Sequence, residues 1–237
     1  MRYVRDQTGR FSQRPHYEPR ELDAEFEKIV VEFLRVRHGK VEFPITTDDL
    51  TVLIERDAQD LDVYADLTGY AHGVEGVTEF WPRRKPTVRI SAALANSENH
   101  ENRLRTTMTH EYGHVHLHSH LFAMETGDSL FDRAGKPGVI ACKRDTMLTA
   151  VRTDWMEWQA GYACGAILMP ATRARATADA YRRDAGVYGA VPVTDRHGQA
   201  MIDLVAGVFQ VSREAARVRL SVLGILGVAQ AAGSLLD

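Results

Sequence analysis

The segment NRLRTTMTHEYGHVHLH, residues 102–118, contains HEYGH at 110–114, which is an HExxH motif. An α-helix turns by about 100° per residue, so His110 and His114 lie within about 40° of each other on one helix face. Both imidazoles can therefore bind one metal ion, with Glu111 about 100° away around the helix. This arrangement predicts a metal-binding helix in which Glu111 takes a proton from a metal-bound water.

Zinc suits this motif because it accepts nitrogen and oxygen ligands and lowers the pKa of its bound water to about 7. We expect one zinc ion per chain. Catalytic zinc sites use three protein ligands and keep a fourth position open, so two histidines do not complete the site. The third ligand must come from elsewhere in the sequence.

Glu157 is the favoured third ligand. It lies on a helix predicted over 154–169, among small and aromatic neighbours. His120 has the six-residue spacing from His114 that metzincins use, but Leu117 stands where those proteins need a helix-ending glycine. The remaining carboxylates lie in a connection predicted over 121–150, whose backbone freedom makes coordination less precise: Glu125, Asp128 and Asp132.

The other histidines of this helix have different expected roles. His118 continues the face of His110 and His114 one turn further along, so we expect it to contact a ligand or the substrate at the edge of the site. His116 and His120 lie four residues apart on the far face and are expected to be exposed to solvent.

The composition is that of an ordinary globular protein: 237 residues, 44% hydrophobic, 26% charged, with a net charge of −3. It excludes wholesale disorder and a protein that coats nucleic acid over its whole surface. Cys142 and Cys164 are too few for a disulfide framework or a cysteine-only zinc site. The N-terminus has no apolar run typical of a secretory signal, and the charge-free stretch 220–236 is short for a membrane span. A cytoplasmic protein without membrane association is expected.

Hydrophobic patterning predicts an α+β fold that is mainly helical. Residues 1–20 are expected to form a basic N-terminal arm, residues 21–170 the catalytic domain, and residues 171–237 a helical C-terminal region. Apolar residues at helical spacing from Leu22 to Val36 predict a helix that stops at Gly39, and a second helix is expected to begin with Thr47 as its N-cap. Three short stretches rich in β-branched and aromatic residues predict a small antiparallel sheet, at 63–67, 77–81 and 87–91.

Two segments together resemble the ImmA/IrrE family of HExxH zinc metallo-endopeptidases: the motif helix at 102–118 and EWQAGYACGAILMP at 157–170. That family pairs an HExxH helix with a later helix that carries a ligand glutamate and ends in LLMP. The resemblance implies a zincin-like fold, zinc held by His110, His114 and Glu157, and Glu111 as the general base. It also implies limited cleavage of a partner regulatory protein, such as a helix-turn-helix transcriptional repressor.

Two positions depart from the family pattern. Gly161 stands where the family has Asn or Asp, four residues after the ligand glutamate, and Ala163 replaces its usual Phe. In glutamate zincins a carboxylate or amide at the first of these positions holds a ligand histidine in its tautomer, and such partners typically matter about 10- to 100-fold. Asp154, one turn before Glu157, is the candidate substitute.

Further residues are candidates for roles around the metal. His118, Tyr112 and Tyr162 are candidate donors to the oxyanion that peptide hydrolysis creates. Cys142 is interpreted either as a thiolate that occupies the open position of zinc as an inhibitory or redox switch, or as a small buried residue. The strand predicted at 87–91 is a candidate edge for binding substrate by strand addition.

The C-terminal phrase FQVSREAARVRL, residues 209–220, is typical of a helix-turn-helix, with Arg213, Arg217 and Arg219 on its second helix. Residues 171–237 nevertheless carry eight Arg against six Asp plus Glu, a net charge of +2. DNA recognition needs a concentrated basic face, so packing or partner docking is favoured over direct DNA binding. Two alternatives to a peptidase stay open, a DNA-binding transcriptional regulator and a catalytically silent zincin-fold sensor, each with a structural zinc.

Overall fold

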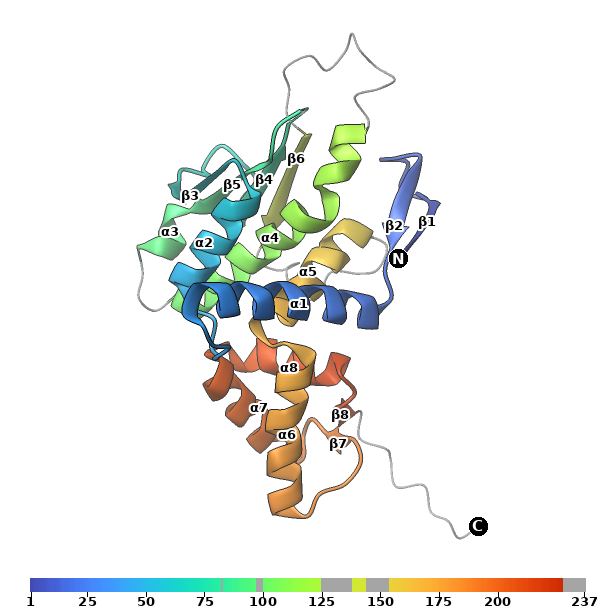
Figure 1. Ribbon diagram of the computed structural model, residues 1–237, viewed down its shortest axis with the longest axis vertical. Coiled ribbons are helices and arrows are strands. Elements are labelled where there is room, and N and C mark those ends of the chain that lie inside the picture. The colour runs from blue at the N-terminus through green and yellow to red at the C-terminus, as the bar shows by residue number, and fades with distance from the viewer. Residues whose placement is uncertain (82, 97–99, 125–137, 144–153, 228–237) are drawn as a thin grey trace.

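The HExxH segment lies in a helix that packs between a four-stranded sheet and a second helix. The computed structural model (Figure 1) describes residues 1–81, 83–96, 100–124, 138–143 and 154–227. Helices α4 (Glu101–Met124) and α5 (Trp155–Leu168) pack against each other, and α4 also packs on the sheet. The predicted α+β class is confirmed. The strands lie in the order β3 (Asp60–Ala65), β5 (Thr87–Ser91), β4 (Val74–Phe80), β6 (Gly138–Lys143), and the short helix α3 (Ala92–Ala95) follows β5.

The predicted antiparallel pairing is right for β4, which pairs antiparallel with both β5 and β6. It is wrong for β3, which lies parallel to β5. Strand β5 enters between β3 and β4, and because these two run in opposite directions, one of its pairings has to be parallel. Strand β6 and the last turn of α4 occupy parts of 121–150 that were expected to be a connection.

Helix α1 (Pro19–His38) buries most of its predicted apolar face and ends at Gly39, which adopts a left-handed conformation with φ of 72°. Val36, placed on that face by the pattern, is 89% exposed. Helix α2 (Thr47–Asp57) has Thr46 as its N-cap, one residue before the predicted cap.

Much of the segment expected to be a basic arm, residues 1–20, is folded rather than extended. Strands β1 (Arg2–Arg5) and β2 (Gln13–His16) form an antiparallel hairpin. The Asp6 carboxylate stabilises its turn by accepting hydrogen bonds of 3.0 Å from the backbone N–H groups of Thr8 and Phe11, and it also accepts one from the Trp155 indole at 3.2 Å. Local side-chain to backbone bonds of this kind leave no hydrophobic periodicity to detect in the sequence.

Gly113, the glycine inside the HExxH motif, allows α4 and α5 to approach closely. A Cβ at this position would lie 3.0 Å from the Ala160 Cα and 3.0 Å from the Ala163 Cβ. Both distances are tighter than ordinary contact, so a side chain here would push the helices apart. The small residue thus determines the separation at which α5 presents Glu157 to α4.

The C-terminal helices pack beneath α1 in the view of Figure 1. Buried apolar side chains from both sides of residue 170 belong to one core cluster, so this region shares its core with the rest of the chain. In the parts of the chain that the structure describes, no helix has the length and apolar character needed to cross a membrane. The C-terminal elements are α6 (Ala171–Ala185), α7 (Arg196–Phe209), α8 (Arg213–Val222) and the paired short strands β7 (Val191–Pro192) and β8 (Leu226–Gly227).

Candidate metal centre

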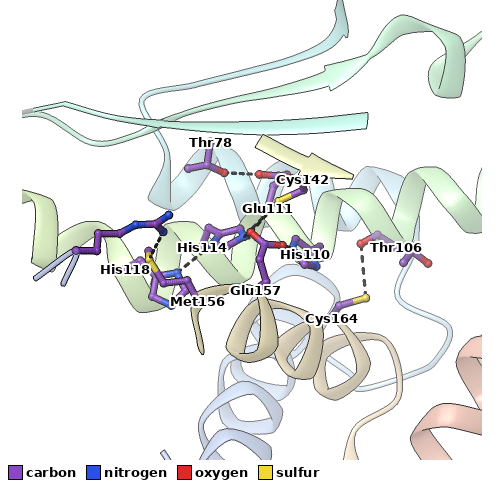
Figure 2. A network of polar contacts seen from close by, with 11 residues as sticks. Thr78, Thr106, His110, Glu111, His114, His118, Cys142, Met156, Glu157 and Cys164 are labelled. Atoms are coloured by element: carbon purple, nitrogen blue, oxygen red, sulfur yellow. Dashed lines mark hydrogen bonds and ion pairs between the residues drawn. The ribbon is translucent and has the colours of Figure 1, made fainter. Parts of the chain in front are cut away.

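Four donor side chains from three elements meet between α4, α5 and β6 (Figure 2). His110 and His114 come from α4, Glu157 from α5 and Cys142 from β6. Their ligand atoms all lie within 4.8 Å of one another, and His110, His114 and Cys142 are fully buried. The structure therefore contains a buried group able to bind a metal ion.

Several distances between these side chains are close to those of a tetrahedral site. His110 Nε2 lies 3.2 Å from His114 Nε2 and 3.1 Å from Glu157 Oε2. Cys142 Sγ lies 3.3 Å from His114 Nε2 and 3.7 Å from Glu157 Oε1. Tetrahedral coordination with bonds of about 2.0–2.3 Å places ligand atoms roughly 3.3–3.8 Å apart. The donor set thus fits a small tetrahedral cation with little rearrangement.

Burial and neighbouring side chains shift the pKa values of Glu157 and Cys142 in opposite directions. Burial raises the pKa of Glu157, but its contacts with His110 and His114 lower it by more, so this carboxylate is ionised. Burial and then the Glu111 and Glu157 carboxylates raise the pKa of the Cys142 thiol well above its usual range. A bound metal reverses that effect on a thiol ligand, so metal binding here releases a proton.

Glu111 lies beside the cluster, and only one of its two carboxylate oxygens has a hydrogen-bond partner among the described residues. Its Oε2 accepts a hydrogen bond of 2.6 Å from the Thr78 hydroxyl on β4. Its Oε1 is buried and has no hydrogen-bond partner among the described residues. Burial raises the pKa of Glu111, and the charges of His114 and His110 offset part of that rise. A carboxylate held in this way is suited to accept a proton.

Gly76 of β4 provides the space that the Glu111 carboxylate occupies. A Cβ at Gly76 would lie 2.2 Å from Glu111 Oε1. We expect Gly76→Ala to displace this carboxylate and, in the catalytic role that the motif predicts for Glu111, to lower turnover by about 100-fold, because a misplacement of about 1 Å can have that effect. Metal content, measured by mass spectrometry, should be unchanged. Gly69→Ala is the matched control, since a Cβ there meets nothing within 4 Å; equal turnover of both variants would contradict the role of Gly76.

His118 is fully buried and contacts His114, one of the four donors. Its Nδ1 lies 3.0 Å from His114 Nδ1, and its Nε2 lies 3.0 Å from Gln159 Oε1. Burial and then the neighbouring His114 lower the pKa of His118, so the ring is neutral. The structure thus places His118 against a predicted ligand histidine, as one of the two expected roles requires, with both of its ring nitrogens in contact with polar neighbours.

His110 and His114 differ in how their second nitrogen is satisfied. His110 Nδ1 is buried and has no hydrogen-bond partner among the described residues, which agrees with the lack of a side chain at Gly161. Asp154 is exposed just before α5, so the expectation that it substitutes for the missing Asn or Asp is wrong. Helix α5 begins at Trp155, which leaves Asp154 at its solvent end.

Cys142 belongs to the cluster because of β6, a strand that the sequence pattern did not reveal. Its neighbours in the strand alternate between exposed Ala141 and buried Ile140, so the thiol points inward by strand periodicity. Three residues that shape the site were also missed, because only the fold brings them to it: Gly76, Thr78 and Gln159.

The tyrosines expected to donate to an oxyanion are engaged elsewhere. The Tyr112 hydroxyl donates to Asp57 of α2 at 2.6 Å, and the Tyr162 hydroxyl donates to Asp23 of α1 at 2.9 Å. Burial raises the pKa of Tyr162 to about 12. Both predictions are therefore wrong, since each hydroxyl stabilises packing between helices.

The two histidines on the far face of α4 are only partly exposed, which corrects the expectation of full solvation. His116 Nε2 lies 3.0 Å from Glu25 of α1, and the His116 ring packs against Phe26. His120 Nε2 lies 3.1 Å from the Tyr3 hydroxyl of the N-terminal hairpin. These contacts join α4 to the N-terminal segment rather than to the cluster.

Arginines of α8 have acidic partners within the chain. Arg213 pairs with Asp203, Arg217 donates to Glu214 at 2.8 Å, and the buried Arg219 donates to Asp23 at 2.7 Å. These ion pairs neutralise the basic face that a DNA-recognition helix needs.

The sequence matches no protein-family model and shows no significant similarity to a curated protein. The resemblance to ImmA/IrrE peptidases therefore rests on the two motifs alone. What the chain does is inferred from the geometry of the site.

Proposed function

We propose that this chain is a zinc-dependent metallo-endopeptidase that makes limited cuts in a partner regulatory protein, such as a helix-turn-helix transcriptional repressor. One observation carries the proposal: a buried glutamate with an open oxygen lies beside a two-histidine, one-glutamate donor set of tetrahedral spacing. His110, His114 and Glu157 would hold the zinc ion, one per chain. A cytoplasmic setting agrees with the two free thiols of the chain.

Zinc, when bound, supplies a Lewis acid that polarises the scissile carbonyl and acidifies the attacking water. Glu111 accepts the proton of that water on Oε1, because Oε2 is already occupied by the Thr78 hydroxyl. The pKa of Glu111, raised by burial, lets the carboxyl keep the proton until it passes to the leaving amine. One side chain thus serves as base and then as acid.

The substrate edge expected at 87–91 is not available, because β5 is paired on both sides by β3 and β4. Among the described strands, β6 ends the sheet on the side of the donor cluster. An extended peptide that pairs with β6 would run alongside the strand that carries Cys142. We therefore propose that the substrate peptide pairs with β6 rather than with β5.

A second function is favoured by Cys142 itself. Structural zinc sites use four protein ligands, whereas catalytic sites keep one position open. With the thiol bound, the site is closed, and a chain that stays closed would be a catalytically silent zincin-fold sensor. The peptidase requires that the thiol leaves, so the two functions differ in one ligand. Direct DNA binding is less favoured, because the α8 arginines are paired.

The proposal is tested by co-expressing the Cys142→Ala variant, whose fourth position is open, with the transcriptional repressors encoded beside its gene. We expect one zinc ion per chain and discrete repressor fragments with a single new terminus, identified by mass spectrometry. A zinc chelator such as 1,10-phenanthroline should stop cleavage, and added zinc should restore it. Intact repressors at full zinc occupancy would favour the silent sensor.

A further inference from the structure

A chain of polar contacts leads from the metal cluster to the N-terminal hairpin. His114 Nδ1 contacts His118 Nδ1 at 3.0 Å, and His118 Nε2 contacts Gln159 Oε1 at 3.0 Å. The Gln159 amide nitrogen then donates to the backbone carbonyl of Pro15 at 2.9 Å. His114 and His118 are fully buried and Gln159 is 1% exposed, so this chain is shielded from solvent along its length. Figure 2 shows the contact between the two histidines.

Which atom donates and which accepts in each of these hydrogen bonds follows from the last member of the chain of contacts, the Pro15 carbonyl. A backbone carbonyl only accepts, so the NH₂ group of Gln159 faces Pro15 and its oxygen faces His118. That oxygen also only accepts, so His118 carries its proton on Nε2 and presents a lone pair at Nδ1. His114 must therefore donate from Nδ1, which leaves the lone pair of His114 on Nε2.

This Nε2 atom is the one that faces the other donors of the cluster. It lies 3.2 Å from His110 Nε2, 3.3 Å from Glu157 Oε1 and 3.3 Å from Cys142 Sγ. In the other tautomer of His114, a proton on Nε2 would point at the position of the metal. The ring nitrogen that is not bound to the metal sets which tautomer a ligand histidine adopts.

The N-terminal hairpin packs against Trp155 next to Pro15, where the chain of contacts ends. Pro15 lies in β2, opposite Tyr3 of β1. Arg14 stacks over the Trp155 ring at 5.4 Å, and the same ring packs edge-on against His118 at 5.4 Å. Trp155 thus contacts both the N-terminal hairpin and His118.

We propose that the N-terminal hairpin is part of the metal centre: its Pro15 carbonyl, acting through the positioning residues Gln159 and His118, fixes His114 in the tautomer that binds the metal. The proposal rests on the proposed function only in taking His114 as a zinc ligand. It also explains how the site retains one oriented histidine although Gly161 offers no side chain and His110 Nδ1 has no partner among the described residues.

The test compares zinc affinities, measured by competition with a chromophoric chelator on the full chain. His118→Phe keeps most of the ring volume but removes the acceptor for His114, and we expect it to lower zinc affinity by about 10- to 100-fold. His118→Asn returns an acceptor near the Nδ1 position and should recover most of the loss. His120→Phe is the matched control, because His120 lies on the same helix and contacts the same hairpin but does not face the cluster. Equal affinity of His118→Phe and wild type would overturn the proposal.

A second measurement reads the tautomers directly, first in the wild-type chain. Nitrogen-15 NMR of the metal-free wild-type chain should show His114 protonated on Nδ1 and His118 on Nε2. Gln159→Leu should convert His118 to a mixture of tautomers while the circular dichroism spectrum is unchanged. His114 protonated on Nε2 in the metal-free wild type would overturn the proposal. A wild type that binds no zinc at all would instead contradict the proposed function.

Discussion

Replacing Glu111 with Gln is expected to lower repressor cleavage by about 10²- to 10⁴-fold, the range that general acid–base catalysis contributes, while zinc content stays at one ion per chain. Gln has nearly the size and shape of Glu and can still bond to Thr78, but it cannot accept the proton of the attacking water. Glu111 is not among the four donors of the cluster, so the metal should be retained. The measurement pairs zinc analysis with a time course of cleavage, both in the Cys142→Ala background.

Tyr112→Phe is the matched control for this prediction. Tyr112 is the next residue of the motif and is buried, but its hydroxyl bonds to Asp57 of α2. We expect its cleavage rate to stay within about 3-fold of the parent, since removal of its hydrogen bonds with Asp57 and Arg56, which are not part of the donor cluster, costs stability rather than turnover. If Glu111→Gln cleaved as fast as Tyr112→Phe, the proposed mechanism would be wrong.

Replacing Cys142 with Ala is expected to raise cleavage by about 10-fold or more relative to wild type, because the fourth position of the metal then becomes open to water. With cobalt in place of zinc, the thiolate-to-cobalt charge-transfer absorption of the wild type should disappear in this variant. That spectrum reports the ligand directly and is independent of any substrate. Zinc should remain bound through His110, His114 and Glu157.

Cys164→Ala controls for the loss of a buried thiol. Cys164 is as buried as Cys142, and burial raises its pKa to about 11, but it bonds to Thr109 at 3.2 Å, away from the donor set. We expect neither its cleavage rate nor its cobalt spectrum to change. A wild-type spectrum without thiolate absorption would show that Cys142 is only a small buried residue, the simpler of the two interpretations drawn from the sequence.

Much of the metal-binding face could be predicted because it belongs to single helices. His110, Glu111 and His114 depend on one helical repeat, and the position of Glu157 on a second helix followed from its local pattern. The N-terminal hairpin, strand β6 and the roles of Tyr112 and Asp154 could not be predicted in the same way. Each depends on a contact between distant segments, such as that of Pro15 with Gln159, for which local periodicity carries no signal.

The sequence by itself determined which side chains share a helix face, because hydrogen bonds between residues four apart impose the same 100° rotation wherever a helix forms. Only the tertiary structure decided what meets that face. It brought Cys142 into the donor set, opened space for Glu111 at Gly76, and connected His114 to the N-terminal hairpin. These juxtapositions arise from the packing of the whole chain, in which strand order and helix separation are set by side chains far away in sequence.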